Sequence, residues 1–225
     1  MHICSDIIKI IENNLEEILS LRNIKQLKKD NSFVSKGDLL CEKLVRDYLK
    51  TLPEKIYLIS EEKNNEDFNF RTYSKVVVID PIDGTENFVS GLKEWGIGIS
   101  VYENEKHIES MIGLPELGLY IQTGDKLPKF ESRIYGISSS LSKEDLLNLE
   151  EGFEYRIIGC SMYNMYNVIT GSFALFQNPK GANSWDILPG LNLALENGCQ
   201  IEVENKKYNG EFLYPNKKYR FKVKH

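Results

Sequence analysis

The chain has 225 residues, of which 33 are acidic and 28 basic, and its formal net charge is −5. This negative balance argues against binding to duplex nucleic acid, because phosphate backbones select positively charged surfaces. No segment approaches the roughly 18 apolar residues of a membrane span, and the amino terminus lacks the pattern of a signal peptide. We therefore expect a cytoplasmic protein outside the membrane, long enough for one large or two small domains.

Cysteine and histidine are sparse. The 4 cysteines have no paired spacing, so they predict neither a zinc site nor a disulfide framework. Only 3 histidines are present, two of them near the termini, which argues against catalysis through a histidine-activated nucleophile. Carboxylates acting with a metal ion are the remaining chemistry.

The first third of the chain predicts helices followed by strands. Apolar residues at helical spacing predict one helix over residues 3–27 and a second after Asp38, a residue suited to a helix N-cap. Strands follow, and their short connections favour antiparallel neighbours. They are expected at 55–60, 75–80, 95–102, 106–114 and 118–122.

Beyond about residue 132, strands and helices alternate, which favours an α/β unit with mixed strand pairing. Strands are expected at 134–138, 155–159, 172–177, 199–204 and 218–224, and helices at 142–149, at 161–170 and from Ser184. The fold class is thus a layered α+β or α/β sandwich. It would have two parts, an antiparallel sheet with two N-terminal helices in residues 1–132 and a smaller mixed-sheet α/β half in residues 133–225.

Several polar segments predict only solvated surface. The stretch at 64–70 lies between two strands and is expected to be a surface loop. The basic pairs Lys28-Lys29 and Lys217-Lys218, as well as Lys180, are expected to be exposed lysines.

The most informative segment runs from Val76 to Thr85, where a β-branched run delivers Asp80 and Asp83 at its carboxyl end. Pro81 removes a ladder donor, and Gly84 permits a tight turn that points its own amide and that of Thr85 toward the acids. Close carboxylates repel one another unless a cation lies between them, and exposed amides attract an anion. The pattern predicts a metal and phosphate site, although Asp-Pro and Asp-Gly are also ordinary turn pairs.

Two further acidic motifs lie elsewhere in the chain. An apolar run at residues 56–60 ends in Glu61-Glu62, and Trp185-Asp186 opens a helix far downstream. Taken alone, Glu61-Glu62 is typical of a charged surface loop. Asp186 alone is typical of an acidic residue that interacts favourably with the helix dipole in a first turn.

The string from Asp80 to Thr85, followed by Glu86-Asn87-Phe88, resembles the signature of the inositol monophosphatase superfamily, whose members are magnesium-dependent, lithium-sensitive phosphatases. Glu61-Glu62, Trp185-Asp186 and the segment at Asp38 match its other motifs in order, although Ser60 stands where the family usually has glycine. The resemblance covers about residues 33–198. It implies an αβαβα sandwich, a homodimer and a small phosphorylated metabolite as substrate.

The resemblance also implies roles for individual residues. Glu61, Asp80 and the carbonyl of Ile82 would hold one magnesium ion, and Asp80, Asp83 and Asp186 a second, with Glu62 near a third. Thr85, with Asp38 behind it, would orient the attacking water, and Glu61 and Asp83 would take part in catalysis. The substrate would contact the Gly84 and Thr85 amides, Ser161 at a helix start, and Asp186. Two or three Mg²⁺ ions are expected, with Mn²⁺ as a substitute and Li⁺ or Ca²⁺ as inhibitors.

The substrate itself stays open. The acidic residue that meets inositol hydroxyls in the family is missing from residues 177–180, and Asn183–Asp186 resembles the 3′(2′),5′-bisphosphate nucleotidases. By that resemblance Lys180 would meet a second phosphate, although an exposed loop lysine is the simpler interpretation. In contrast, Glu86–Val89 resembles the inositol phosphatase form. Sugar phosphates, including fructose 1,6-bisphosphate, also remain candidates. The alternative of another class is a protein that binds phosphorylated ligands without turnover.

Overall fold

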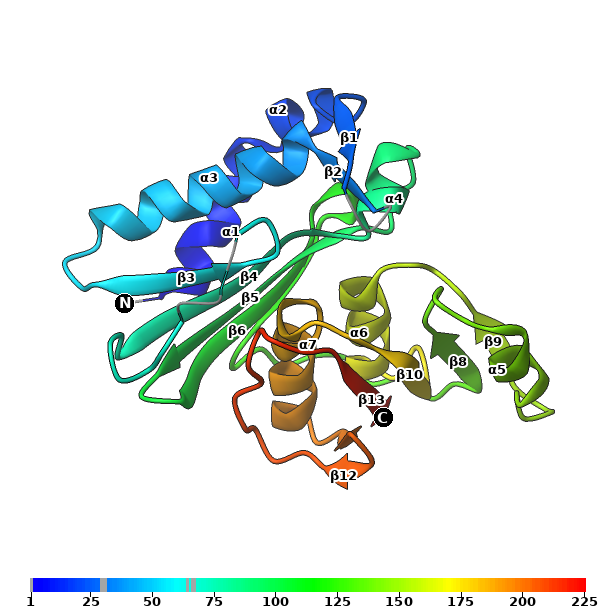
Figure 1. The fold of residues 1–225 in the computed structure, drawn as a ribbon. Helices are drawn as coiled ribbons and strands as arrows, with labels where there is room; N and C mark the ends of the chain where they lie inside the picture. The colour runs from blue at the N-terminus through cyan, green and yellow to red at the C-terminus, as the bar shows by residue number, and fades with distance from the viewer. Residues whose placement is uncertain (1, 29–31, 64, 66–67) are drawn as a thin grey trace.

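The computed structural model describes residues 2–28, 32–63, 65 and 68–225. Helices and sheets alternate in layers, with helices on the outer face of a five-stranded sheet and two helices between that sheet and a six-stranded one (Figure 1). The five-stranded sheet has the order β3-β4-β5-β6-β7. Its strands are β3 (Ile56–Ser60), β4 (Lys75–Asp83), β5 (Gly96–Glu103), β6 (Lys106–Leu114) and β7 (Leu119–Gln122). The layered fold class expected from the sequence is confirmed.

The outer layer contains α1 (Ile3–Asn13), α2 (Leu15–Ser20) and α3 (Lys36–Thr51). The prediction of one helix over 3–27 is wrong. The Asn14 side chain donates to the carbonyl of Ile10 (2.7 Å), a local bond of the kind that competes with a continuous helix. Residues Lys25–Leu27 form β1, which pairs antiparallel with β2 (Phe33–Ser35).

Strand β4 is the centre of the sheet and is buried on both faces. Val77 and Ile79 pack toward the outer helices, whereas Val76 and Val78 belong to the core between the two sheets. β3 and β4 pair in parallel, not antiparallel as expected, because the connection at 61–74 returns to the start of β4; the pairs from β4 to β7 are antiparallel. Two carboxyl ends therefore share one edge of the sheet.

The predicted end of this strand at Asp80 is also wrong. β4 continues through Pro81 to Asp83, and its register against β5 shifts between Asp80 and Asp83. A bulge of this kind accommodates a proline that has no amide to donate, and it re-aims the side chains that flank it.

The second half forms a six-stranded sheet with the order β12-β11-β13-β10-β8-β9. Its strands are β8 (Ile134–Ile137), β9 (Glu154–Arg156), β10 (Leu175–Ala182), β11 (Gln200–Val203), β12 (Lys206–Lys207) and β13 (Tyr219–Lys224). β8 pairs in parallel with both β9 and β10 while the other pairs are antiparallel, which confirms the predicted mixed pairing.

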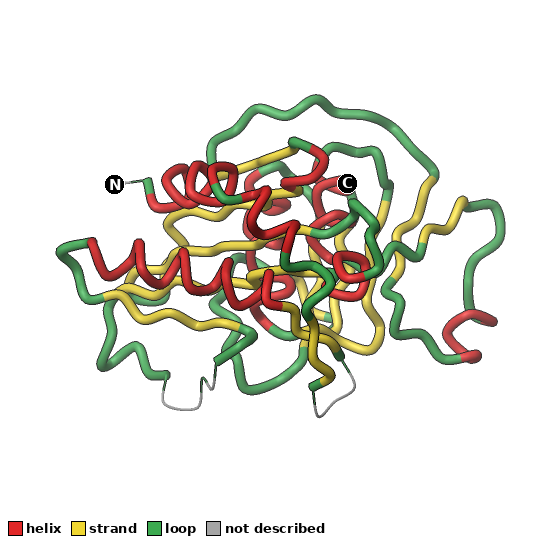
Figure 2. Tube along the Cα trace, turned by 90° about the horizontal axis from the view of Figure 1, so that it is seen from above, coloured by secondary structure: helices red, strands yellow, loops and turns green. Residues whose placement is uncertain are grey.

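Helices α6 (Ser161–Ile169) and α7 (Ser184–Glu196) lie between the two sheets, and α7 contacts strands of both. Short helices α4 (Thr85–Val89), α5 (Lys143–Leu147) and the 3₁₀ turn Pro115–Leu117 complete the described elements. Both views place α5 at one end of the molecule, beyond β9 (Figures 1 and 2).

Within the predicted surface loop at 64–70, residues 64, 66 and 67 lie outside the described residues. Phe68 and Phe70 from the same stretch pack against the core between the sheets, so this part is not a polar surface. Among the residues that the structure describes, no helix has both the length and the apolar character needed to cross a membrane.

Candidate metal centre

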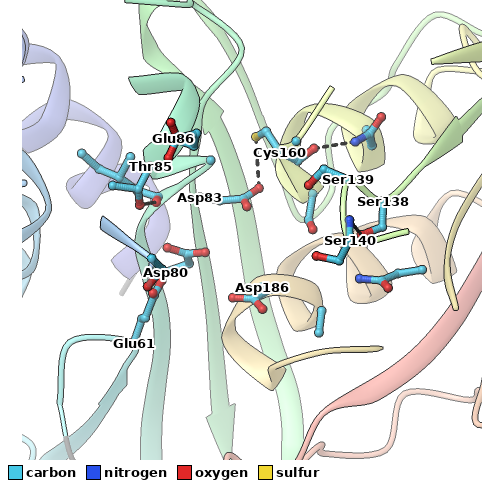
Figure 3. Close-up of a pocket in the computed structure, with 18 of the residues that line it drawn as sticks. Glu61, Asp80, Asp83, Thr85, Glu86, Ser138, Ser139, Ser140, Cys160 and Asp186 are labelled. Carbon is cyan, nitrogen blue, oxygen red and sulfur yellow. Dashed lines mark hydrogen bonds between the residues drawn. The ribbon is translucent and has the colours of Figure 1, made fainter. Parts of the chain in front are cut away.

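Three carboxylates converge at one edge of the five-stranded sheet. Glu61 follows β3, Asp80 lies near the end of β4, and Asp186 lies in the first turn of α7; one oxygen from each lies within 4.8 Å of the others (Figure 3). The parallel register pairs Ser60 with Ile79, so Glu61, which follows β3, comes next to Asp80 of β4. Helix α7 brings in Asp186 from the layer between the sheets.

The environment of Asp80 fits a divalent cation. The residue is 1% exposed, and its Oδ1 atom has no hydrogen-bond partner among the described residues. Burial raises the Asp80 pKa well above its usual range, and the nearby charges of Glu61 and Asp83 raise it further. A buried, unpaired carboxylate costs free energy. Hard carboxylate oxygens are what Mg²⁺ prefers, so these residues fit a magnesium ion.

Asp83 lies beside this cluster, but one oxygen of its side chain points toward the start of α6. Its Oδ2 accepts hydrogen bonds from the Met162 amide and from the Cys160 thiol (3.0 Å), both at the start of α6 (Figure 3). Burial raises the Asp83 pKa to about 6, although these hydrogen bonds act in the opposite direction. The structure thus holds one Asp83 oxygen on α6, and its role as a metal ligand stays a prediction.

Asp186 caps a helix and also belongs to the carboxylate cluster. It is the third residue of α7, and its Oδ2 accepts from the backbone amide (2.8 Å) and side-chain amide (3.3 Å) of Asn183, the N-cap. Burial, followed by the charges of Glu61 and Asp83, raises the Asp186 pKa well above its ordinary value. Helix capping therefore fixes this carboxylate at the metal centre.

Thr85 lines the cavity on the side of the carboxylates, and Asp38 contacts its side chain. The Thr85 Oγ1 atom is 3.1 Å from Asp38 Oδ1 and 2.9 Å from the carbonyl oxygen of Ile82. Asp38 is 1% exposed and is the third residue of α3, whereas Ser35 is its N-cap, so the N-cap interpretation of Asp38 is wrong. The second oxygen of Asp38 accepts from the Ser35 amide (2.8 Å) and hydroxyl (2.5 Å).

Gly84 and Ser161 line the same cavity, whose volume is about 270 Å³. Gly84 precedes α4 with φ of +80°, and a Cβ atom there would lie 2.9 Å from the Cβ of Cys160. Only glycine fits this combination of left-handed backbone and close approach. The turn is thereby pressed against the start of α6, where Ser161 lies.

Sequence reasoning missed two features of the site. Ser138–Ser140, directly after β8, line the wall across from the carboxylates (Figure 3). A run of three serines at a strand end was the available signal. Lys28 was expected to be solvated, but its Nζ lies 2.7 Å from Glu61 and 2.6 Å from Glu62; Lys29 lies outside the described residues.

The ion pairs of Lys28 affect its own pKa and that of Glu62. Burial by itself lowers the Lys28 pKa, but the charges of Glu61 and Glu62 outweigh burial and raise it. Burial raises the Glu62 pKa to about 7 despite the pairing with Lys28. Lys28, which follows β1, thus brings a positive charge of the chain's own to Glu61 and Glu62.

The fold and the carboxylate cluster define an α/β layered protein with a candidate divalent-metal centre beside a small polar cavity. Residues 1–222 match the model of the inositol monophosphatase family. The chain belongs to this family.

Curated relatives include two kinds of phosphatase. The chain is 26% identical over 121 residues to 3′(2′),5′-bisphosphate nucleotidase CysQ of Aggregatibacter actinomycetemcomitans, which covers 52% of this chain and 45% of that protein. It is 25% identical over 169 residues to the fructose-1,6-bisphosphatase/inositol-1-monophosphatase of Thermotoga maritima, 65% of each chain. The matched segments therefore span less than two thirds of these relatives.

Solved structures show the same fold. An IMPase of Thermotoga maritima has a TM-score of 0.80 at 21% identity, with 100% of this chain and 92% of that chain covered. An IMPase/NADP phosphatase complexed with Mg²⁺ and phosphate has a TM-score of 0.81 at 19% identity, with 99% and 88% covered.

Proposed function

We propose that the protein is a Mg²⁺-dependent phosphomonoesterase acting on a small phosphorylated metabolite, an inositol monophosphate or a related sugar phosphate. The observation that carries this proposal is the cluster of Glu61, Asp80 and Asp186, with Asp80 Oδ1 buried and unpaired beside a cavity of about 270 Å³. Family membership and a structural neighbour described with Mg²⁺ and phosphate support it.

Glu61, Asp80 and the Ile82 carbonyl would hold one ion, and Asp80, Asp83 and Asp186 a second. When bound, magnesium supplies positive charge to the phosphate oxygens and makes a water molecule more acidic. The four carboxyl groups of Glu61, Asp80, Asp83 and Asp186 lie close together, and burial raises the pKa values of Asp80 and Asp186. Bound ions would offset the repulsion between their negative charges.

The chain's own groups would position the reactants. Asp38 accepts from the Thr85 hydroxyl and so fixes its orientation toward the attacking water. The Gly84 and Thr85 amides would hold phosphate oxygens at the end of β4. Ser161, at the start of α6, would contact the organic part of the substrate.

The test is phosphate release from inositol 1-phosphate, adenosine 3′,5′-bisphosphate, fructose 1,6-bisphosphate and NADP, with Mg²⁺ and with chelator. We expect turnover only with Mg²⁺, and a loss of at least about 100-fold in Asp83→Asn, because changing even the outer partners of a metal site costs 10–100-fold. Asp47→Asn, on the exposed face of α3, is the control. Metal-independent turnover, or an Asp83→Asn variant as active as the control, would contradict the proposal.

The same panel decides between the alternatives. Preference for the adenosine substrate would favour a bisphosphate nucleotidase, the activity in the names of several relatives. Magnesium binding without turnover of any substrate would favour a non-catalytic phospholigand-binding protein.

We also propose that the protein is a cytoplasmic homodimer, as the family resemblance implies. Light scattering after gel filtration should then give twice the chain mass of 25.9 kDa. A species of 25.9 kDa at micromolar concentration would contradict the dimer.

A further inference from the structure

The cavity at the metal centre has two chemically different walls. The carboxylates of Glu61, Asp80 and Asp186 lie on one side, and Ser138–Ser140 face them from the loop after β8 (Figure 3). Lys218, just before β13, also lines the cavity and is the only basic residue among its described lining residues. A phosphate at the carboxylates would leave the organic part of a substrate beside the serines and Lys218.

The backbone around Lys218 is fixed by a bulge in β10. The register of β10 against β13 shifts between Asn178 and Ala182. The buried Asn178 side chain holds this bulge, because its Oδ1 accepts the amides of Lys180 and Gly181, both at 3.0 Å.

Gly181 then lets the two segments approach closely. It has φ of +85°, and a Cβ atom there would lie 3.3 Å from the Lys218 Cβ and 3.3 Å from the Tyr219 amide nitrogen. Any larger residue would push the start of β13 away from the bulge. The bulge thus fixes the Lys218 backbone beside the strand that leads into α7 and Asp186.

The ammonium of Lys218 is available to a ligand. It forms no ion pair with a carboxylate in the described part of the chain, although its charge acts on Asp186, where it lowers a pKa that burial raises. The neighbouring lysines differ, because Lys180 Nζ pairs with Asp145 at 2.8 Å and Lys217 Nζ lies 4.8 Å from the centre of the Tyr219 ring.

We propose that Lys218, with the serine run Ser138–Ser140, binds a second phosphate on the substrate and so selects bisphosphorylated over monophosphorylated metabolites. A lysine ammonium binds phosphate as a point charge, and serine hydroxyls donate hydrogen bonds to its oxygens. The inference rests on the proposed function, since it assigns the first phosphate to the metal centre. It narrows the proposed substrate class, because Lys218 would favour a sugar or nucleotide that carries two phosphates over an inositol monophosphate.

The experiment compares matched substrates that differ by one anionic group. The ratio of kcat/KM for fructose 1,6-bisphosphate to that for fructose 1-phosphate is measured with Mg²⁺, together with the ratio for adenosine 3′,5′-bisphosphate to adenosine 3′-monophosphate. In Lys218→Gln we expect at least one ratio to fall by roughly 10-fold, as for a partly exposed charge pair. Lys218→Arg should keep most of the preference because it keeps the charge.

Lys217→Gln and Lys180→Gln are the matched controls, since each removes one positive charge beside the cavity without removing Lys218. An equal fall in these controls would mean a general surface potential, and unchanged ratios in Lys218→Gln would also overturn the inference; both results leave the proposed function intact. A wild-type protein that hydrolyses inositol 1-phosphate but none of these four substrates would overturn this inference alone, whereas a protein that hydrolyses none of the five would overturn the proposed function as well. Comparison with 6-phosphogluconate, whose second anion is a carboxylate, tells whether Lys218 needs a phosphate or only a negative charge.

Discussion

The carboxyl group of Asp80 is buried next to other acids, so its removal should act on stability and on metal binding in opposite ways. In Asp80→Asn, we expect a chelator-treated protein that is more stable by roughly 1–2 kcal/mol, because one buried like charge is gone. Thermal unfolding with and without Mg²⁺ measures this, and the stabilisation by Mg²⁺ should disappear.

Glu131→Gln is the control for Asp80→Asn, since this carboxylate is exposed and outside the cavity. The control should keep both the unfolding midpoint and the response to Mg²⁺. A chelator-treated Asp80→Asn protein that unfolds at a lower temperature than wild type would show that Asp80 is not under electrostatic strain.

The contribution of the Thr85 hydroxyl to catalysis can be measured separately from that of the metal ligands. Its Oγ1 lies 3.1 Å from Asp38, so Thr85→Val removes the oriented hydroxyl while keeping the side-chain shape. We expect kcat at saturating Mg²⁺ to fall about 100-fold or more, within the range for a lost proton-handling group. Thr85→Ser should recover most of kcat, and equal activity of the serine and valine variants would contradict a role for the hydroxyl.

At the scale of elements, two of the helices that begin with a capping box use the same residue pair, serine and aspartate. Ser35 and Asp38 form a capping box at the start of α3, and Ser142 and Asp145 form one at the start of α5. Ser35→Ala and Ser142→Ala should each cost about 1 kcal/mol of unfolding free energy. Only Ser35→Ala should lower kcat, because Asp38 also holds Thr85. Denaturant unfolding and turnover measured on both variants make the comparison, and equal kcat values would refute the link.

Elements with a continuous apolar pattern were predictable from the sequence. β6 has the predicted bounds of Lys106–Leu114, because alternation and burial both mark it. The break between α1 and α2 was not predictable from apolar spacing, since Ile11 and Ile18 still fall on one buried face across Asn14. The parallel pairing of β3 with β4 depends on the path of the connection at 61–74, which has no periodic signal.

The same distinction applies to the site. Glu61 follows a strand, Asp80 lies near the end of one, and Asp186 lies in the first turn of a helix, so their elements bring them together as the motifs indicated. Lys28 and Ser138–Ser140 lie in irregular segments, where position is set by tertiary contacts alone. The sequence around a lysine in a polar stretch does not indicate whether its ammonium group forms an ion pair in the folded protein.

At the scale of the whole molecule, the raised pKa values predict a pH dependence of stability. The Asp83 pKa rises from its ordinary 3.8 to about 6 through burial, and that of Glu62 from 4.5 to about 7. A group whose pKa is higher in the folded state stabilises the protein at low pH and loses this contribution as the pH passes the folded pKa. In chelator, the unfolding free energy should therefore fall between about pH 4 and 7, the range from the ordinary pKa values of these groups to their raised ones.

Urea unfolding at several pH values measures this dependence, and Asp83→Asn should flatten it. Magnesium should reverse the loss near pH 8, because metal ligands bind in their deprotonated form. A chelator-treated protein that becomes more stable as the pH rises from about 4 to 7 would contradict the assignment of these groups.

Asp80 lies in the five-stranded sheet and Glu61 directly follows one of its strands, whereas Asp186 comes from a helix that contacts both sheets and lies about half the chain away in sequence. Contacts between such distant segments form late, after the costly loop closure has taken place. An ion bound by all three carboxylates therefore stabilises the finished protein more than the folding transition state. Its effect should appear as slower unfolding, so that metal supply governs the lifetime of the folded chain and leaves the folding rate almost unaltered.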